Sequence, residues 1–276
     1  MDGAARDASR TALGVAALRA AHQVLDQKPL ILEDPVAIRL LDPGALQHIR
    51  GKKTELQGPS ARGLRSHVVL RSRFTEDHLR ERAEAGVSQY VILGAGLDTF
   101  AYRQPSWARG LSVFEVDHPA TQEAKRMRLH AGGLECPPNL TFAPVDFESS
   151  SLREGLQAAG LDFTRPAFFS WLGVTMYLTE EAIDATLRFA AAFPAGSGMV
   201  LTFAQPEGSG LADLAAAAGE PWITRFTPLG METKLRETGF SRVAFLEPEE
   251  AAARYYQDRS DGLPPPRRIN TALAEV

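Results

Sequence analysis

The stretch Gln89–Arg103, QYVILGAGLDTFAYR, decides the fold of this 276-residue chain. Its apolar run Tyr90–Leu93 is long enough for a buried strand and too short for a helix. The strand is expected to end at Gly94-Ala95-Gly96, and Leu97–Tyr102 is expected to continue as a helix. In open α/β sheets, ligands bind where the carboxyl ends of the strands meet such turns. Glycine lets the chain turn sharply and lets a ligand contact bare backbone, so this stretch is the expected cofactor site.

Two classes of cofactor suit this turn. A dinucleotide fingerprint has the pattern G-x-G-x-x-G/A, whose third small residue permits close packing of helix on strand. Here the third position is Thr99. Glu115 and Asp117 follow about twenty residues later, where a carboxylate at the end of a second strand accepts hydrogen bonds from ribose hydroxyls. Such a carboxylate serves NAD and S-adenosylmethionine alike, so both cofactors remain open at this point.

Composition narrows the class of protein. The chain is 44% hydrophobic and 23% charged, as in ordinary soluble globular proteins with a sizeable core. A net charge of −4 favours neither nucleic acid nor an anionic membrane as a partner. A single cysteine, Cys136, and six histidines without an H-x-x-x-H pair predict no disulfide framework and no metal site. The Thr11–Ala21 run is interrupted by Arg19 and resembles neither a secretion signal nor a membrane span, so we expect a cytoplasmic protein.

Residues 1–85 are expected to be helical. Ser9 is a candidate cap for the first helix. Gly51–Gly63 is expected to be a mobile loop, and a long helix is expected from Leu64 to Ala85. Arg71 lies on the apolar face of that helix, where an arginine must bind an anion or extend its charged end to solvent. An internal ion pair or a side chain extended to solvent explains its position as well as a bound ligand does.

From Gly86 onward, short apolar runs alternate with helical segments. This pattern predicts a mostly parallel seven-stranded α/β sheet with helices on both faces. The last two strands, with the proline-rich turn Leu263–Pro266 between them, predict an antiparallel C-terminal hairpin. A sheet of the NAD-binding type needs no reversed strand, whereas a methyltransferase sheet has one. The strands are expected at Gln89–Leu93, Ser112–Val116, Leu140–Ala143, Ala167–Leu172, Met199–Ala204, Ser241–Leu246 and Ile269–Glu275.

Several motifs together resemble the bacterial branch of the leucine carboxyl methyltransferase family, which uses S-adenosylmethionine. They occur in the family's order over roughly residues 8–180. The resemblance implies a class I methyltransferase (Rossmann-like) core at 86–276 and an N-terminal helical lid at 1–85. The motifs are SRTALGVAALRAAH with EDPVAIRLL, RSRFTEDHL, VILGAGLDTFAYR, VFEVDHPATQEAKRMRL, and VDFE with WLGVTMYLT.

The same resemblance assigns the donor site. Arg71 matches the arginine that holds the methionine carboxylate, and Gly94 and Gly96 match the glycine loop beneath the methionine and ribose. Asp117 matches the acid that accepts from the ribose hydroxyls, although it is equally placed to cap the helix that Pro119 begins.

Three further residues are carried over in the same way. Asp146 and Phe147 match the pair beside adenine, and Arg10 matches a basic residue of the lid. Asp146 is also placed to end a turn after the third strand. Leu172 departs from the family pattern, because relatives often have glutamate there, so a polar contact near the donor is absent or supplied elsewhere. Phe100 also replaces a frequent arginine.

The expected reaction is methylation of a carboxylate or hydroxyl oxygen of a small molecule. A carboxylate acceptor needs no general base, whereas a hydroxyl does. Tyr177 and His118 are the candidates for a base, with packing and helix initiation as their respective structural alternatives. Other possible functions are methylation of a protein's C-terminal carboxylate, an NAD-dependent oxidoreductase, and a regulator that binds an adenosyl ligand without catalysis.

Overall fold

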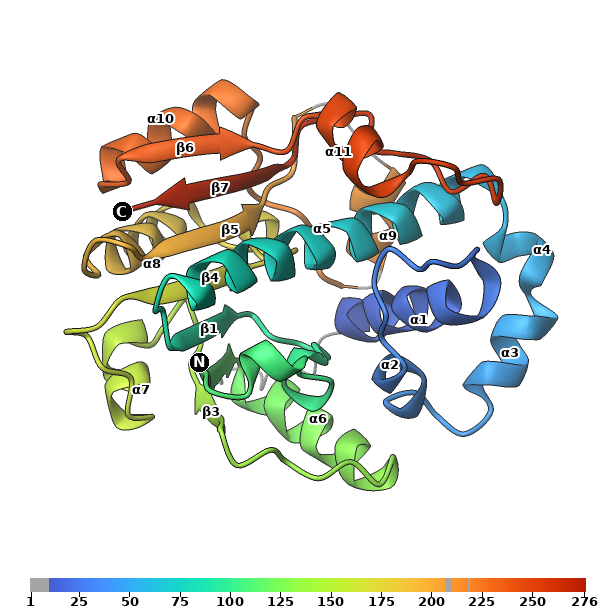
Figure 1. The fold of residues 1–276 in the computed structure, drawn as a ribbon, viewed down its shortest axis with the longest axis horizontal. Helices are drawn as coiled ribbons and strands as arrows, with labels where there is room; N and C mark the ends of the chain where they lie inside the picture. Colours follow the sequence, from blue (N-terminus) through green and yellow to red (C-terminus); the bar gives the residue numbers. More distant parts are fainter. Residues whose placement is uncertain (1–9, 207–209, 218) are drawn as a thin grey trace.

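The computed structural model describes residues 10–206, 210–217 and 219–276, and a seven-stranded sheet runs through its centre (Figure 1). The strand order is β3-β2-β1-β4-β5-β7-β6. Only β7 is reversed, because it pairs antiparallel with β5 and with β6 while the other neighbours are parallel. The predicted mostly parallel sheet with an antiparallel C-terminal pair is thus confirmed. The strands are β1 (Gln89–Leu93), β2 (Ser112–Asp117), β3 (Leu140–Pro144), β4 (Ala167–Trp171), β5 (Gly198–Thr202), β6 (Arg242–Phe245) and β7 (Thr271–Glu275).

The central strands are buried on both faces, which is why their sequences are unbroken apolar runs. In β1, Val91 and Leu93 contribute to one core while Tyr90 and Ile92 contribute to the other. This alternation follows from the two-residue period of a strand. The sheet therefore separates two hydrophobic cores and holds the turn at the end of β1 in a fixed place.

Different helices supply the two cores. The core that contains Val91 takes apolar residues from α7 (Leu152–Ala158), α8 (Glu180–Ala191) and α10 (Pro228–Thr238). The core that contains Tyr90 takes residues from α5 (Pro59–Glu84) and α11 (Pro248–Tyr255). The remaining elements are α1 (Arg10–Leu25), α2 (Val36–Arg39), α3 (Ala45–Gly51), α4 (Lys53–Leu56), α6 (Pro119–Ala131), α9 (Gly210–Ala217) and the 3₁₀ turns η1 (Phe100–Tyr102), η2 (Ser106–Ala108) and η3 (Thr175–Tyr177).

The helix predicted at Leu97–Tyr102 is wrong, because the segment forms only the single 3₁₀ turn η1. The Asp98 N–H donates to the Ala95 carbonyl at 2.7 Å, and the Asp98 carboxylate accepts from the Phe100 N–H at 2.8 Å. These local bonds replace the i to i−4 pattern of a helix. Phe100 is buried with its ring centroid 5.1 Å from that of Tyr90, so it is a core residue here.

The prediction of a mobile loop at Gly51–Gly63 is also wrong. The segment contains α4, and α5 begins at Pro59 rather than at Leu64. Proline suits the first position of a helix because its missing N–H would have no partner there. The longer α5 brings five additional residues, 59–63, to the cavity described below. Ser9, the predicted cap of α1, lies outside the described residues.

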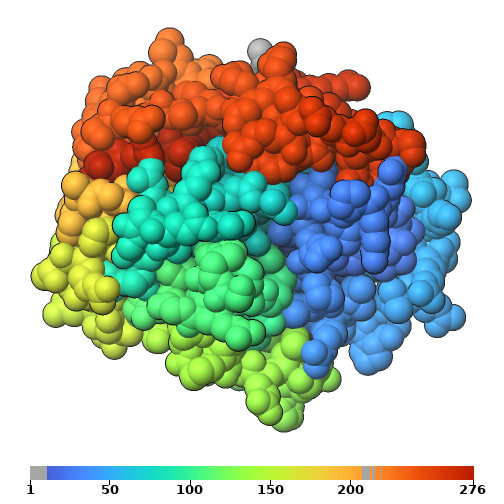
Figure 2. All heavy atoms as spheres, in the orientation of Figure 1, coloured from blue at the N-terminus to red at the C-terminus, as the bar shows by residue number. Residues whose placement is uncertain are grey.

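The antiparallel pairing of β6 with β7 is confirmed, but the connection differs from a tight turn. It contains α11 and a segment that reaches across to the N-terminal helices (Figures 1 and 2). There Arg259 donates to the Gln27 carbonyl at 2.9 Å, and Asp261 accepts from the Gln27 N–H at 2.8 Å. In the ranges that the structure covers, no helix has the length and hydropathy to cross a bilayer.

Candidate functional site

A cavity of about 2100 Å³ lies at the carboxyl ends of β1, β2, β4 and β5, beside α1 and α5. Small-molecule sites typically occupy about 300–1,000 Å³, so this cavity has room for more than one ligand. It brings together all the predicted site residues whose side chains are described. They are Arg71, Gly94, Gly96, Asp117, His118, Asp146, Phe147 and Tyr177. Arg10 begins α1, but its side chain lies outside the described part of the structure.

The glycine turn after β1 is closely packed from two sides. Gly94 has φ +66°, and a Cβ there would lie 2.3 Å from Val174 Cγ2. Gly96 has φ +50°, and a Cβ there would lie 3.2 Å from the Cβ of Ala12 on α1. Both glycines are therefore required by backbone conformation, and Gly94 is required by space as well.

Asp117 ends β2 and ties it to the glycine turn. Its carboxylate accepts from the Gly96 N–H at 2.5 Å and from the His118 N–H at 2.7 Å. Burial raises the pKa of Asp117 above its usual value, although both N–H donors favour the charged form. The capping role belongs to His118, whose Nδ1 accepts from the Ala120 N–H at 3.2 Å. The prediction that His118 helps to begin this helix is confirmed.

Arg71 is buried on the cavity face of α5, with 9% of its surface exposed. Its guanidinium lies against Gly173, where a Cβ would be 2.6 Å from Nη1. Burial and the nearby Arg19 lower the pKa of Arg71 to about 10, so it stays charged at neutral pH. Among the described residues no ion pair or hydrogen bond engages this guanidinium, so the internal ion pair considered from the sequence is not formed there.

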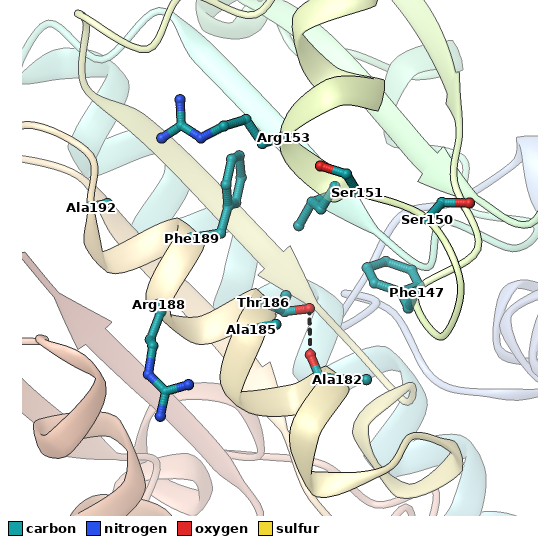
Figure 3. Close-up of a pocket in the computed structure, with 11 residues that line it drawn as sticks. Phe147, Ser150, Ser151, Arg153, Ala182, Ala185, Thr186, Arg188, Phe189 and Ala192 are labelled. Carbon is teal, nitrogen blue, oxygen red and sulfur yellow. Dashed lines mark hydrogen bonds between the residues drawn. The ribbon is translucent and has the colours of Figure 1, made fainter.

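Asp146 and Phe147 follow β3 at another side of the cavity. The Asp146 carboxylate accepts from the Glu148 N–H at 3.0 Å and from the Ser149 hydroxyl at 2.8 Å, which makes it a turn residue. The Phe147 ring lies 6.2 Å from that of Trp171. Phe147 also borders a second, smaller cavity of about 370 Å³ between α7 and α8 (Figure 3).

Two further residues shape the cavity beside the glycine turn. Tyr177 closes η3 and is half-buried in the wall. Leu172 is also half-buried, contacts the core that contains Tyr90, and presents an apolar surface. Leu172 therefore offers the cavity an apolar side chain where relatives often have the polar side chain of glutamate.

Sequence reasoning missed the buried network that joins the N-terminal helices to the glycine turn. Asp34 accepts from Arg19 Nε at 2.9 Å and from the Thr99 hydroxyl at 2.7 Å. Arg19 also donates to the Leu97 carbonyl. Burial alone would raise the pKa of Asp34, but Arg19 and Arg103 hold it below its usual value. No spacing rule links an acid and a base so far apart, so the sequence carried no signal for this pair.

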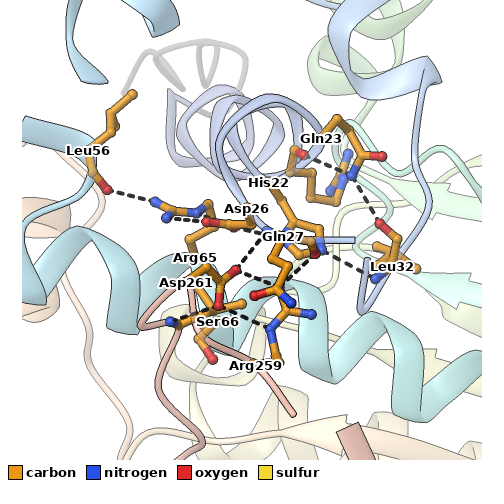
Figure 4. Close-up of polar contacts among 12 residues, drawn as sticks. His22, Gln23, Asp26, Gln27, Leu32, Leu56, Arg65, Ser66, Arg259 and Asp261 are labelled. Atoms are coloured by element: carbon orange, nitrogen blue, oxygen red, sulfur yellow. Dashed lines mark hydrogen bonds and ion pairs between the residues drawn. The ribbon is translucent and has the colours of Figure 1, made fainter. Parts of the chain in front are cut away.

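A second network fixes α1 to α5. Asp26 at the end of α1 accepts from Arg65 Nε and Nη2, both at 2.7 Å, and contacts His22 Nδ1 at 2.7 Å (Figure 4). Arg65 also donates to the Leu56 carbonyl at 2.7 Å. Burial opposes the charge of Asp26, but His22 and Arg65 keep its pKa below the usual value. This bidentate pair holds both cavity-lining helices in register.

Comparisons with known proteins identify the family of this chain. The sequence model described as leucine carboxyl methyltransferase matches residues 12–191. A Bacillus subtilis protein named "Putative S-adenosyl-L-methionine-dependent methyltransferase YktD" is 36% identical over 206 residues, which are 71% of this chain and 67% of that protein. A Mycobacterium avium protein with the same description, apart from the name YktD, is 35% identical over 186 residues. That match covers 63% of this chain and 58% of the M. avium protein, less than two thirds of its length.

Solved structures show the same fold. A crystal structure titled a "putative methyltransferase" from Thermobifida fusca superposes with a TM-score of 0.52 at 21% identity, covering 82% of this chain and 87% of that one. A DUF574 family protein from Streptomyces avermitilis also gives 0.52, at 18% identity over 94% and 96% of the two chains. The chain therefore belongs to the leucine carboxyl methyltransferase family, a family of S-adenosylmethionine-dependent methyltransferases.

Proposed function

We propose that this protein transfers the methyl group of S-adenosylmethionine to a carboxylate or hydroxyl oxygen of a small molecule. The observation that carries the donor assignment is Arg71, a buried charge without a partner in the described chain, in one cavity with the glycine turn and Asp117. A buried charge requires a compensating partner, and the donor's methionine carboxylate is one.

The other donor contacts follow from the same cavity. Gly94 and Gly96 lie beneath the methionine and ribose. Each Asp117 oxygen accepts one backbone N–H and retains capacity for a ribose hydroxyl. The Asp146 carboxylate and the Phe147 N–H are the proposed contacts of adenine, and Phe147 contributes an apolar wall.

Residues 1–85 form the proposed lid, with 86–276 as the core. Support comes from the contact of Ala12 with Gly96 and from the bonds of Arg19 and Asp34 to the turn after β1. Arg10 is placed in this lid by resemblance alone. Closing the lid excludes water from the reacting atoms.

Methyl transfer is an in-line displacement in which positive charge leaves the sulfur as the new bond to oxygen forms. The protein therefore mainly aligns the acceptor with the methyl group and excludes water. A carboxylate acceptor needs no base. For a hydroxyl acceptor, Tyr177 is the better candidate base, since His118 Nδ1 is already engaged by the Ala120 N–H. The cytoplasmic location stays a prediction.

Calorimetry on the purified protein tests the donor assignment. We expect S-adenosylmethionine and S-adenosylhomocysteine to bind, and NAD to bind much more weakly. Equal affinity for NAD would contradict the proposal. Methyl-labelled donor presented with a panel of small carboxylic acids and alcohols then tests transfer. Binding without formation of S-adenosylhomocysteine with any acceptor would favour a non-catalytic regulator.

A further inference from the structure

The cavity extends well beyond the proposed donor site. On α5, His67 and then Arg62 line it on the N-terminal side of Arg71. With a rise of about 1.5 Å per residue, the backbone at position 62 lies roughly 13 Å along the helix from position 71. Gly262, which lies against the Arg62 guanidinium, and the prolines at 264–266 also line the cavity. An acceptor can therefore extend along α5 away from the glycine turn.

Part of the cavity wall is apolar. Leu172 and Met176 line it, together with Trp222 from the segment after α9. That segment is held in place because the Ile223 N–H donates to the Met176 carbonyl at 2.8 Å. His67 contributes no charge here, because burial and Arg71 lower its pKa to about 3. An apolar body is the group that suits this wall.

The distant end carries positive charge. Arg62 is half-buried, and its guanidinium lies against Gly262, where a Cβ would be 2.8 Å from Nη1. Within the described ranges, the Arg62 guanidinium makes no ion pair or hydrogen bond, unlike those of Arg65 and Arg73 on the same helix. Arg267 lines the same end and is likewise without an ion pair among these residues.

Three acidic side chains that line the cavity have partners other than Arg62. Glu55 pairs with Lys52 at 3.3 Å, and the Asp98 carboxylate accepts from the Phe100 N–H. Asp117 is bound to the glycine turn. A guanidinium that faces a cavity with an apolar wall favours an anion, and a carboxylate can accept two parallel hydrogen bonds from it.

We propose that the methyl acceptor is an amphipathic acid. Its apolar body contacts Leu172, Met176 and Trp222, and a carboxylate distant from the methylated oxygen binds Arg62. This inference rests on the proposed function, because it takes the glycine-turn end of the cavity as the donor site.

The test uses protein saturated with S-adenosylhomocysteine and a matched pair of probes, ω-hydroxydodecanoate and its neutral amide. We expect the acid to bind about tenfold more tightly than the amide, the lower end for hydrogen bonds to a charged group. Arg62→Gln should remove this preference, and Arg62→Lys should restore part of it. Arg109→Gln, the same change at an exposed residue outside the cavity, should keep the preference.

The outcomes separate the two proposals. S-adenosylhomocysteine affinity is measured on every variant, and Arg62→Gln should leave it unchanged. Failure of S-adenosylhomocysteine to bind the wild type would overturn the proposed function. Binding of S-adenosylhomocysteine with equal affinity for acid and amide, or with neither probe bound, would overturn the acceptor class alone. Tighter binding of dodecyl phosphate that is lost in Arg62→Gln would replace the carboxylate with a phosphate ester.

Discussion

Arg71 is a buried charged residue of the fold that also lines the proposed donor site. Folding places its charge against Gly173 and inside the cavity, at 9% exposure. Asp98 is near enough to interact with this charge, but no described carboxylate forms an ion pair with it. Leaving a buried charge without a partner typically costs about 3–5 kcal/mol. An anionic ligand that pairs with this charge removes the cost, which favours binding of the ligand.

Arg71→Met should therefore weaken S-adenosylhomocysteine binding by roughly 2–5 kcal/mol, the usual cost of losing one partner of a desolvated charge pair. Arg71→Lys should recover only part, because lysine cannot form the two parallel bonds of a guanidinium. Methylthioadenosine keeps the adenosine and sulfur but lacks the carboxylate, so its affinity should hardly change. Calorimetry with both ligands checks this. Equal weakening of both ligands would show that Arg71 is structural.

Asp117→Ala should weaken both S-adenosylhomocysteine and methylthioadenosine, because both carry the ribose. The expected loss is roughly 1.5–3 kcal/mol for hydrogen bonds to a charged group. Stability should also fall, since the Gly96 and His118 N–H groups lose their acceptor. Affinity and melting temperature measured on the same variant separate these effects. If the affinity per folded molecule is unchanged, Asp117 does not bind the ribose and only stabilises the glycine turn.

At the scale of elements, the β2–α6 contact contains a buried ion pair. Lys125 Nζ lies 2.5 Å from Glu115 Oε2, whereas Glu115 Oε1 is buried without a partner. Burial raises the pKa of Glu115 from 4.5 to about 7, despite the favourable charge of Lys125. The folded state thus prefers the protonated acid. Its contribution to stability is complete below about pH 4.5 and is lost as the pH rises to about 7.

Glu115→Gln should remove this pH dependence while keeping the side-chain size. The free energy of unfolding of the wild type, relative to the variant, should fall by about 1.4 kcal/mol per pH unit across that window. Urea unfolding at several pH values between 4.5 and 7 measures the difference. In the variant Lys125 faces a neutral amide at every pH, which adds a constant offset. Parallel pH curves for the two proteins would show that Glu115 does not titrate there.

Element by element, predictions from the sequence succeeded where burial alone decides the structure. The run at Tyr90–Leu93 could only be a strand between two cores, and Arg71 was correctly placed on the inward face of its helix. The prediction failed at Leu97–Tyr102, where Asp98 binds the backbone locally. Helical periodicity cannot reveal such a side-chain bond.

For the whole molecule, the order of motifs was enough to predict the sheet and to gather most of the site. It could not predict that Arg19 and Asp34 bind the turn after β1, or that Gln27 meets Arg259 and Asp261. Such contacts join distant parts of the chain and depend on the final packing. The distant end of the cavity, with Arg62, was missed because the residues before Leu64 were assigned to a loop.

The position of β7 has a consequence for biosynthesis. On the ribosome, β1 to β5 emerge in an order that lets each pair with a neighbour. Among the described strands, however, β6 (Arg242–Phe245) has β7 (Thr271–Glu275) as its one partner, and β7 is translated later. Until β7 is made, one edge of β5 is unpaired and β6 has no neighbouring strand. Unpaired strand edges are prone to incorrect pairing. A chain released after Asn270 should therefore be cleaved by protease around β6, while the full chain resists. Translation of β7 thus decides whether the nascent sheet is complete or can still pair with other chains.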